Sequence, residues 1–275
     1  MEIDVSGSVM RALREREAQT GKSLGSLVDA LLSEALELER HSLFQVSTSN
    51  ALVKGVFDGS TTVGELRSHG DFGLGTFDRL DGEMILIEGV CFRATADGVV
   101  TQASDDRDVP FALVTRFEAD ITDAIDSEVS FEGLTARLDG LRPSQNLFAA
   151  MRVQGTFDEL SLRAACPARP GEGLVEATSH QSEFEPGDIR GTLVGFWGPE
   201  YARAVSVPGY HFHFISEDRS LGGHVLGLRG RDLDIEVHTE RDLHLSLPET
   251  ADFLAADLRG EHAEELDRAE TGRSD

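Results

Sequence analysis

The sequence predicts an α+β fold, with two mixed or antiparallel β-sheet units and few helices, preceded by a short helical module at the N-terminus. The 275 residues, 40% of them hydrophobic, provide enough material for two globular domains and a sizeable core. From about His41 onward, short β-rich segments are punctuated by glycine, and few helical periods occur before Asp257. The first forty residues show instead the apolar spacing of helices. These patterns together favour the α+β class.

Residues 1–40 have the pattern of a short strand followed by two helices. We expect Ser8 to cap the first helix, Gly21 to end it and Ser23 to begin the second, because these residue types fall where helix boundaries need them. The strand rests on alternating apolar residues and the helices on two apolar series: Ile3 and Val5, then Val9 and Leu13, then Leu24, Leu27, Val28, Leu31, Leu32 and Ala35.

This layout, with TGKSLGSLVDALLSEAL across the turn, resembles the ribbon-helix-helix modules that pair as intertwined dimers. In those modules the outward strand residues contact DNA. Here the outward positions are Glu2 and Asp4, which cannot neutralise phosphate. We therefore expect residues 1–40 to serve dimerisation or to form a simple helical extension. A homodimer is the expected assembly, because such a strand cannot satisfy its backbone alone.

The remaining chain is expected to form two domains. Gly75–Leu80 (GTFDRL) recurs as Gly155–Leu160 (GTFDEL), which indicates two related sheet units. The Pro/Gly-rich stretch CPARPGEG at 166–173 is the expected junction. The predicted domains are therefore 1–40, 41–165 and 166–275, and the last one ends in a charged tail that is either a solvated helix or disordered.

The charge balance is strongly acidic. Fifty acidic residues against twenty-five basic ones give a formal net charge of −25, and Lys22 and Lys54 are the only lysines. This average field would repel nucleic acid, so we do not expect a nucleic-acid partner. A surface so rich in carboxylates is typical of a protein in concentrated salt, where screening suppresses self-repulsion, and we predict halophily.

The chain carries no signal for a membrane or for export. No apolar run approaches the ~20 residues that a bilayer requires. Glu2 and Asp4 stand where a secretory signal would be basic, so we predict a cytoplasmic protein. Cys91 and Cys166 are too few for a disulfide scaffold and are expected to be reduced.

A cluster of histidines carries the strongest chemical signal. In YHFHFISEDRSLGGHVL, alternation along a strand places His211 and His213 on one face and the aromatic residues between them on the other. The turn formers in 216–223 predict a reversal that brings His224 back antiparallel, about 5 Å from its cross-strand neighbour. Three imidazoles can then reach one Zn²⁺ at ~2.1 Å and leave a fourth position open, as a catalytic zinc ion requires.

The alternative is three surface histidines on a hairpin, which is the usual outcome for a bare His-x-His. The returning His224 and the glycines at 222 and 223, which permit close backbone approach, favour metal binding. The other six histidines show no such spacing and are expected to be ordinary residues: His41, His69, His180, His238, His244 and His262.

Several separate stretches resemble the acetolactate decarboxylase family, over most of the chain from about Leu43 onward. They are HGDFGLGTFDRLDGEMI at 69–85, FAAMRVQGTF at 148–157 and GTLVGFWGPEYARAVSVPGYHFHFISEDRSLGGHVL at 191–226. The resemblance implies that His211, His213 and His224 hold a zinc ion. It also implies active-site roles for the acidic residue of LDGE and the arginine of MRVxGTF, which correspond to Glu83 and Arg152 here.

The family also has a glutamate near its C-terminus. Spacing from His224 favours Glu270, with Glu265 as the reserve. Without the resemblance, Glu83 would read as an exposed residue after a turn, and Arg152, between Met151 and Val153, as a solvent-facing or ion-paired arginine.

The implied reaction is decarboxylation of acetolactate to acetoin. Loss of carbon dioxide leaves an electron pair that the adjacent ketone must accept, and a zinc ion chelating the ketone and hydroxyl oxygens would stabilise the resulting enediolate. Three neutral histidines leave the ion its full charge. We expect Arg152 to fix the substrate, and Glu83 and the C-terminal glutamate to handle protons. By analogy with the family, a homodimer is again expected.

Two other functions compete with this reading. His211-x-His213 followed by Glu217 imitates the first metal motif of the cupins, which would make the chain another metalloenzyme, although the second cupin motif is missing. A ligand-sensing DNA-binding regulator would instead act through residues 1–40. The acidic strand and the overall charge count against that regulator.

Overall fold

The computed structural model describes residues 5–35, 41–260 and 262–271, and the chain divides into two units, residues 1–40 and residues 41–275. In the first unit, α1 (Gly7–Thr20) and α2 (Leu24–Ala35) form the predicted helix pair, with Leu13 and Leu27 buried. The predicted strand residue Ile3 lies outside the described residues.

The boundaries of α1 correct one prediction and confirm another. Ser6, not Ser8, caps the helix: Ser6 is extended and its hydroxyl accepts a hydrogen bond from the Val9 amide, so the helix begins two residues earlier than expected. Gly21 ends α1 as predicted, because its φ of +70° is a left-handed conformation that glycine adopts without strain.

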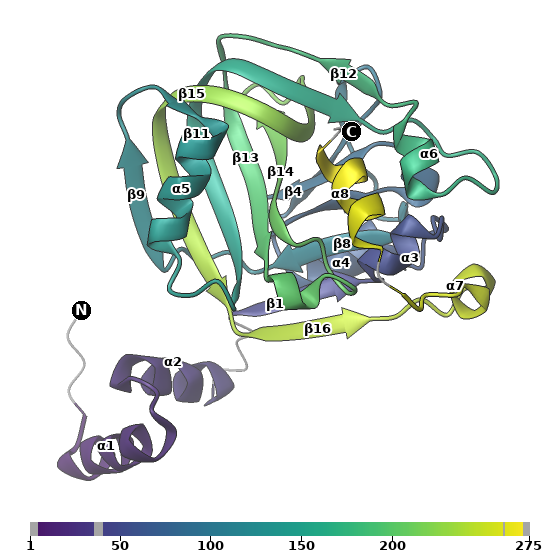
Figure 1. Ribbon diagram of the computed structural model, residues 1–275. Helices are drawn as coiled ribbons and strands as arrows, with labels where there is room; N and C mark the ends of the chain where they lie inside the picture. The colour runs from purple at the N-terminus through teal and green to yellow at the C-terminus, as the bar shows by residue number, and fades with distance from the viewer. Residues whose placement is uncertain (1–4, 36–40, 261, 272–275) are drawn as a thin grey trace. The chain divides into compact units, whose positions relative to one another are not determined.

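Residues 41–275 are built on two seven-stranded sheets with few helices, which confirms the α+β class (Figure 1). The first sheet has the order β16-β1-β8-β3-β4-β5-β6. All its pairs are antiparallel except β1 with β16. Its strands are β16 (Asp242–Ser246), β1 (Ser42–Val46), β8 (Phe111–Thr115), β3 (Phe72–Thr76), β4 (Glu83–Ile87), β5 (Val90–Ala94) and β6 (Val100–Gln102).

The second sheet is antiparallel and has the order β10-β15-β14-β13-β11-β12, with β9 paired to β15 and a further pairing of β15 with β11. Its strands are β10 (Val129–Ser130), β15 (Gly222–Glu240), β14 (Gly209–Ser216), β13 (Ile189–Gly198), β11 (Phe148–Ala164), β12 (Ser182–Phe184) and β9 (Ile121–Ile125). A small third sheet pairs β2 (Thr61–Thr62) with β7 (Asp108–Val109).

The helices of this unit are short. They are α3 (Ser49–Val53), α4 (Val63–His69), α5 (Phe131–Leu141), α6 (Leu174–Thr178), α7 (Ala251–Ala255) and α8 (Ala263–Thr271), with 3-10 turns η1 (Asp78–Leu80) and η2 (Glu200–Ala202). Among the described residues, no helix is long and apolar enough to cross a membrane.

The main core lies between the two sheets and contains residues of both, such as Leu74 and Ile85 from the first and Val194 and Phe196 from the second. The outer face of the second sheet packs with α5, and the outer face of the first packs with α4. On β14, Phe212 packs in the hydrophobic cluster between the second sheet and α5. Because side chains alternate along a strand, its neighbours His211 and His213 face the first sheet. The histidines therefore lie between the sheets.

The predicted boundary at 165/166 does not separate two domains. Strand β11 ends at Ala164 but pairs with β13 and β15, which follow the boundary, and β16 returns to the first sheet. The repeated hexapeptide also has two different structures, because Gly75–Leu80 ends β3 and enters η1, whereas Gly155–Leu160 lies inside β11. The stretch 166–173 therefore joins β11 to α6 within one unit.

The charged tail is neither disordered where it is described nor a fully solvated helix. Residues 263–271 form α8, which buries Leu266 and Ala269. Helices α3, α6 and α8 contact one another beside the edge of the sheets (Figure 1). This packing brings α8 to the histidine strands.

Candidate functional site

Three buried histidines converge at the hairpin of β14 and β15, as predicted. His213 and His224 are cross-strand partners, and His211 lies two residues before His213 on the same face. Their ring nitrogens approach closely: Nε2 of His211 lies 3.2 Å from Nε2 of His213 and 3.1 Å from Nδ1 of His224. All three side chains are at most 8% exposed, so this is not a surface cluster.

The arrangement fits a divalent metal ion. Ligands at ~2.1 Å from a tetrahedral centre are about 3.4 Å apart, close to the observed separations. Two outer ring nitrogens contact backbone carbonyls, Nδ1 of His213 with Met84 at 2.9 Å and Nε2 of His224 with Glu270 at 3.0 Å. Carbonyl partners of this kind fix the tautomer and orientation of metal-ligating imidazoles.

Burial keeps these imidazoles neutral. Loss of hydration lowers the pKa of His213 to about 4 and the pKa values of His211 and His224 well below their usual range. The nearby Arg163 guanidinium lowers all three further. Neutral rings offer lone pairs at pH 7, as metal ligands must.

The structure brings Glu83 to the histidines. Glu83 begins β4 and is 8% exposed, so it is not the exposed turn residue that its DGE context allows. One carboxylate oxygen lies 3.5 Å from Nε2 of His213, and the other accepts a hydrogen bond from the Ala165 amide. Burial raises the pKa of Glu83, against smaller opposing effects of Arg163 and the Ala165 amide.

Glu270, on α8, reaches the same cluster from the other side. Its Oε2 lies 3.6 Å from Nε2 of His211 and 3.8 Å from Nε2 of His224. Glu265 instead pairs with His262 and does not line the pocket. Burial raises the pKa of Glu270 to about 7; Arg163 opposes the shift and the Glu83 carboxylate adds to it. The choice of Glu270 over Glu265 agrees with this geometry.

Arg152 is not in the pocket. Its Nε donates to Glu236 on the neighbouring strand, its Nη1 lies 3.9 Å from Glu88, and its side chain is 24% exposed. The arginine that lines the pocket is Arg163, near the end of β11, where it pairs in register with His224. Arg163 is 5% exposed, and its Nη2 lies 3.8 Å from Oε2 of Glu270.

A change of phase along β11 explains this correction. Arg163 lies an odd number of residues after Arg152, so strict alternation would place the two on opposite faces. Strand β11 has irregular register at three points, and its outward apolar positions change from odd to even numbers between Phe157 and Leu160. Arg163 therefore faces the histidines, and only an expectation of bulges could have found it from sequence.

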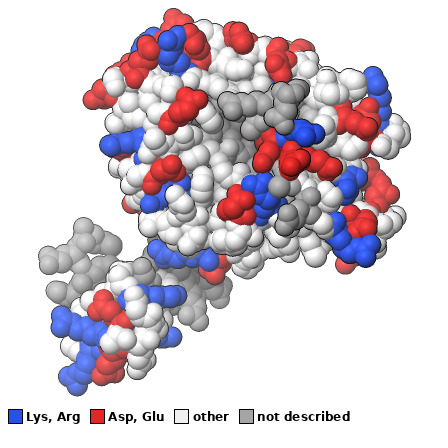
Figure 2. Space-filling view, viewed as in Figure 1, with Lys and Arg blue, Asp and Glu red and all other residues white. Residues whose placement is uncertain are grey.

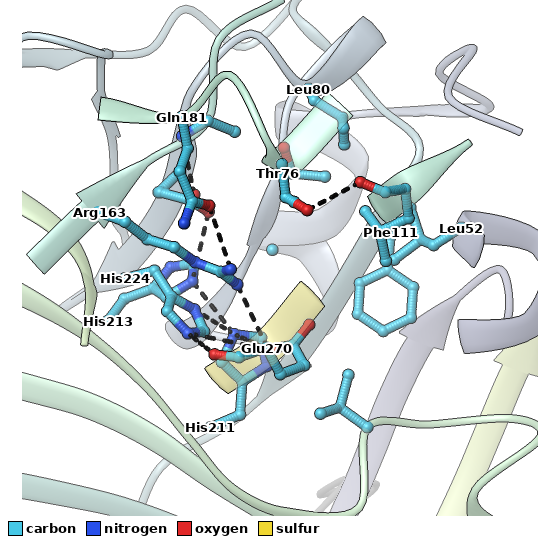
Figure 3. Close-up of a pocket in the computed structure, with 16 residues that line it drawn as sticks. Leu52, Thr76, Leu80, Phe111, Arg163, Gln181, His211, His213, His224 and Glu270 are labelled. Atoms are coloured by element: carbon cyan, nitrogen blue, oxygen red, sulfur yellow. Dashed lines mark hydrogen bonds and ion pairs between the residues drawn. The ribbon is translucent and has the colours of Figure 1, made fainter. Parts of the chain in front are cut away.

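The pocket combines this charged cluster with an apolar wall. Figure 3 shows Arg163, the three histidines and Glu270 pointing toward one another, with Leu52 and Phe111 on another side. Gln181 accepts a hydrogen bond from Nη1 of Arg163, and the same nitrogen donates to the carbonyl of Ala269. These contacts fix the guanidinium beside Glu270.

The structure does not support the cupin alternative. Glu217, which that alternative needs as a metal ligand, has an exposed side chain that lies near Arg190 and does not line the pocket. The cupin interpretation therefore lacks its acidic ligand.

On the face viewed in Figure 2, acidic side chains gather over α8, the helix that carries Glu270.

Comparison with known proteins identifies relatives over most of the chain. The sequence profile of the alpha-acetolactate decarboxylase family matches residues 43–260. The chain is 41% identical over 250 residues to the alpha-acetolactate decarboxylase of Methanosarcina mazei, covering 90% of this chain and 85% of that protein. It is 39% identical over 217 residues to that of Bacillus subtilis, covering 78% and 85%.

Solved structures show the same fold. The crystal structure of alpha-acetolactate decarboxylase from Bacillus subtilis superposes with a TM-score of 0.81 at 37% identity, over 83% of this chain and 99% of that one. A Staphylococcus aureus protein described as similar to alpha-acetolactate decarboxylase gives 0.80 at 32% identity, over 83% and 100%. The family match begins at residue 43 and so lies wholly in the second unit.

Proposed function

Since the chain belongs to the alpha-acetolactate decarboxylase family, a family of lyases, we propose that it converts acetolactate to acetoin and carbon dioxide. In this proposal the reaction uses a divalent metal ion held by His211, His213 and His224. The convergence of three neutral, buried imidazoles beside two carboxyl groups and a guanidinium supports the proposal. Zinc is the proposed ion, because borderline nitrogen ligands in a compact site suit it.

Decarboxylation breaks the bond between the carboxylate carbon and the carbon that bears the hydroxyl. Its electron pair passes toward the adjacent ketone, giving an enediolate, and carbon dioxide leaves. The metal ion, when bound, supplies Lewis-acid stabilisation of the negative charge that develops on the substrate oxygens. The remaining requirements fall on the side chains of the pocket.

Arg163 is the proposed substrate-binding cation, in place of Arg152. Its buried guanidinium is fixed by Gln181 and the Ala269 carbonyl, so it is oriented before the substrate arrives. A fixed cation in a dry pocket favours both the substrate carboxylate and the charge that develops as carbon dioxide leaves. Arg152 instead donates from Nε to Glu236 and lies outside the pocket.

Glu83 and Glu270 are the proposed proton carriers. Burial raises the pKa of Glu83 and brings the pKa of Glu270 to about 7, so a protonated carboxyl at Glu270 is available near neutral pH. After decarboxylation, one of these carboxyl groups delivers its proton to the former carboxyl-bearing carbon, which yields acetoin, and the resulting carboxylate is reprotonated from solvent. The two groups approach the histidines from different elements, β4 and α8, so delivery from one of them would set the configuration of acetoin.

The other sequence expectations stay predictions. These are assembly as a homodimer, adaptation to salt, a cytoplasmic location and a dimerising role for residues 1–40. The helix pair of the first unit is observed, but its pairing with a second copy is a proposal that size measurement with and without residues 1–40 would test.

The direct test of function is acetoin formation. Purified chain is incubated with acetolactate, and acetoin is measured before chelation, after chelation, and after Zn²⁺ is restored. We expect acetoin from the untreated enzyme, loss after chelation and recovery with zinc. Failure to form acetoin in any metal-loaded preparation would refute the substrate assignment, and full activity after complete metal removal would refute the role of the metal.

A further inference from the structure

Strand β16 (Asp242–Ser246) ends the first sheet and is exposed along its whole length. It pairs in parallel with β1 on one side, and in the described part of the chain no strand lies on its other side (Figure 1). Each of its five residues is exposed. An open strand edge presents backbone amides and carbonyls that can pair with a strand of another chain. Strand β16 is therefore a candidate contact surface.

The hydrogen bonds to β1 show which backbone groups face the open edge. The Asp242 amide donates to the His41 carbonyl. Alternate residues of a strand direct their amide and carbonyl to the same edge, so the even-numbered residues of β16 bond to β1. Leu243 and Leu245 therefore direct their amides and carbonyls to the open edge. No described residue forms a hydrogen bond with these groups.

The same two leucines make one face of this edge apolar. The register pairs Leu243 with Leu43, which lies in the core between the two sheets, so Leu243 and Leu245 are on that inner face. Each of them is 36% exposed, and Leu247, just after the strand, is 53% exposed. Contact with another chain at this edge would remove the leucine side chains from water.

The edge has no net charge, although the protein is strongly acidic. The chain carries a formal charge of −25, whereas residues 241–248 (RDLHLSLP) contain one arginine and one aspartate. Two copies that meet here avoid the repulsion expected over the rest of the surface. In antiparallel pairing the start of one strand lies beside the end of the other, so the exposed Arg241 of one copy approaches the exposed Glu249 of the other. Charge therefore favours a second copy of this chain, paired antiparallel.

We propose that β16 pairs antiparallel with β16 of a second copy about a twofold axis at His244, which joins the first sheets of the two chains into one. Leu243 of each copy then lies opposite Leu245 of the other, and the two residues exchange both of their backbone hydrogen bonds. The contact is self-complementary, as a closed dimer requires. This assigns to the expected homodimer a surface outside residues 1–40, and it is independent of the proposed reaction.

Disulfide trapping in the full-length chain tests this contact. At the twofold axis His244 faces its own copy in a non-hydrogen-bonded pair, whose Cα atoms lie ~4.5 Å apart, within the range that a disulfide spans. His244→Cys should therefore form a covalent dimer under mild oxidation. The matched control is Ala124→Cys, an exposed position on β9, which pairs with β15 of the second sheet. The unmodified chain gives the background from its two free cysteines, Cys91 and Cys166.

Two substitutions of Leu245 test whether the trapped dimer depends on strand pairing. Leu245→Pro removes an amide that faces the open edge and is not bonded to β1, so an edge strand tolerates it. Leu245→Lys keeps the amide but places a charge among the leucines, which opposes edge pairing. Each is combined with His244→Cys, and circular dichroism and the unfolding temperature check that the variants fold.

The measured quantity is the rate of covalent dimer formation at one protein concentration. His244→Cys should react at least about tenfold faster than Ala124→Cys, because thiols held together in a pair have a far higher effective concentration than thiols on separate surfaces. Either Leu245 substitution should lower the rate to that of the control. Equal rates for His244→Cys and Ala124→Cys would overturn the proposal. A rapid His244→Cys reaction that neither Leu245 substitution slows would also overturn it.

Discussion

Replacement of Arg163 by methionine tests the structure-based choice between the two arginines. Arg163→Met keeps much of the aliphatic volume but removes the cation that lies beside Glu270 in the histidine pocket. The enzyme should still bind its metal ion, because no histidine is changed. The expected defect is in transition-state stabilisation, since the developing negative charge loses a fixed partner.

The size of the effect follows from the burial of Arg163. Loss of one preorganised donor to a developing oxyanion costs about 2.7–4 kcal/mol, or 10²–10³ in kcat. The side chain is 6% exposed, so solvent cannot replace it. Removing one partner of a buried ion pair costs about 3–5 kcal/mol of stability, and protonation of Glu270, whose pKa is already raised, should reduce that cost.

Arg152→Met is the matched control. Arg152 is partly exposed and pairs with Glu236 and Glu88 at the edge of the inter-sheet region, so its loss should cost no more than about 1 kcal/mol of stability and leave kcat within about twofold. Both variants are measured for acetoin formation, metal content and unfolding by denaturant. A large loss of kcat in Arg152→Met with normal turnover in Arg163→Met would refute the assignment.

Three further predictions concern Glu83, Glu240 and salt. Glu83→Gln should keep its metal ion but lower turnover by about two to four orders of magnitude, and near-normal acetoin formation would remove Glu83 from the proton pathway. In chelator-treated protein, burial raises the pKa of Glu240 to about 8, so the folded state holds this proton more tightly than the unfolded state. Glu240 should therefore contribute a fall in stability of about 1.4 kcal/mol per pH unit from about pH 4.5 to pH 8, and none above. Glu240→Gln should remove this contribution from the pH dependence measured in denaturant titrations, and a slope equal to that of the unmodified chain would contradict the buried carboxyl as its source. Because the net charge is −25, added salt should raise the unfolding temperature; complete folding and activity in dilute buffer would reject halophily.

The parts of the site that the sequence predicts are local or separated by a readable turn. His211 and His213 share a face because strand side chains alternate, and the turn residues after Ser216 predict the return of His224. Glu270 followed from its spacing and the family resemblance. Its position depends on Leu266 and Ala269, which bury one side of α8.

The missed features depend on long-range pairing. Arg163 reaches the pocket because the alternation of β11 changes phase at its bulges, which no simple periodicity reveals. The expected boundary at 165/166 was wrong because β11 pairs with strands that follow it. The stacking of His41 on His238 was also beyond the sequence, because 197 positions separate the two residues in the chain.

The central claim is that three imidazoles hold the metal ion on which decarboxylation depends. The most direct measurement is metal content and acetoin formation in one preparation of His213→Ala, compared with the unmodified chain. His213 is 1% exposed and its Nε2 lies 3.2 Å from Nε2 of His211, so its loss removes one of the three converging ligands. We predict one fewer metal ion per chain and no detectable acetoin. A folded variant that keeps its full metal content and its turnover would contradict the claim.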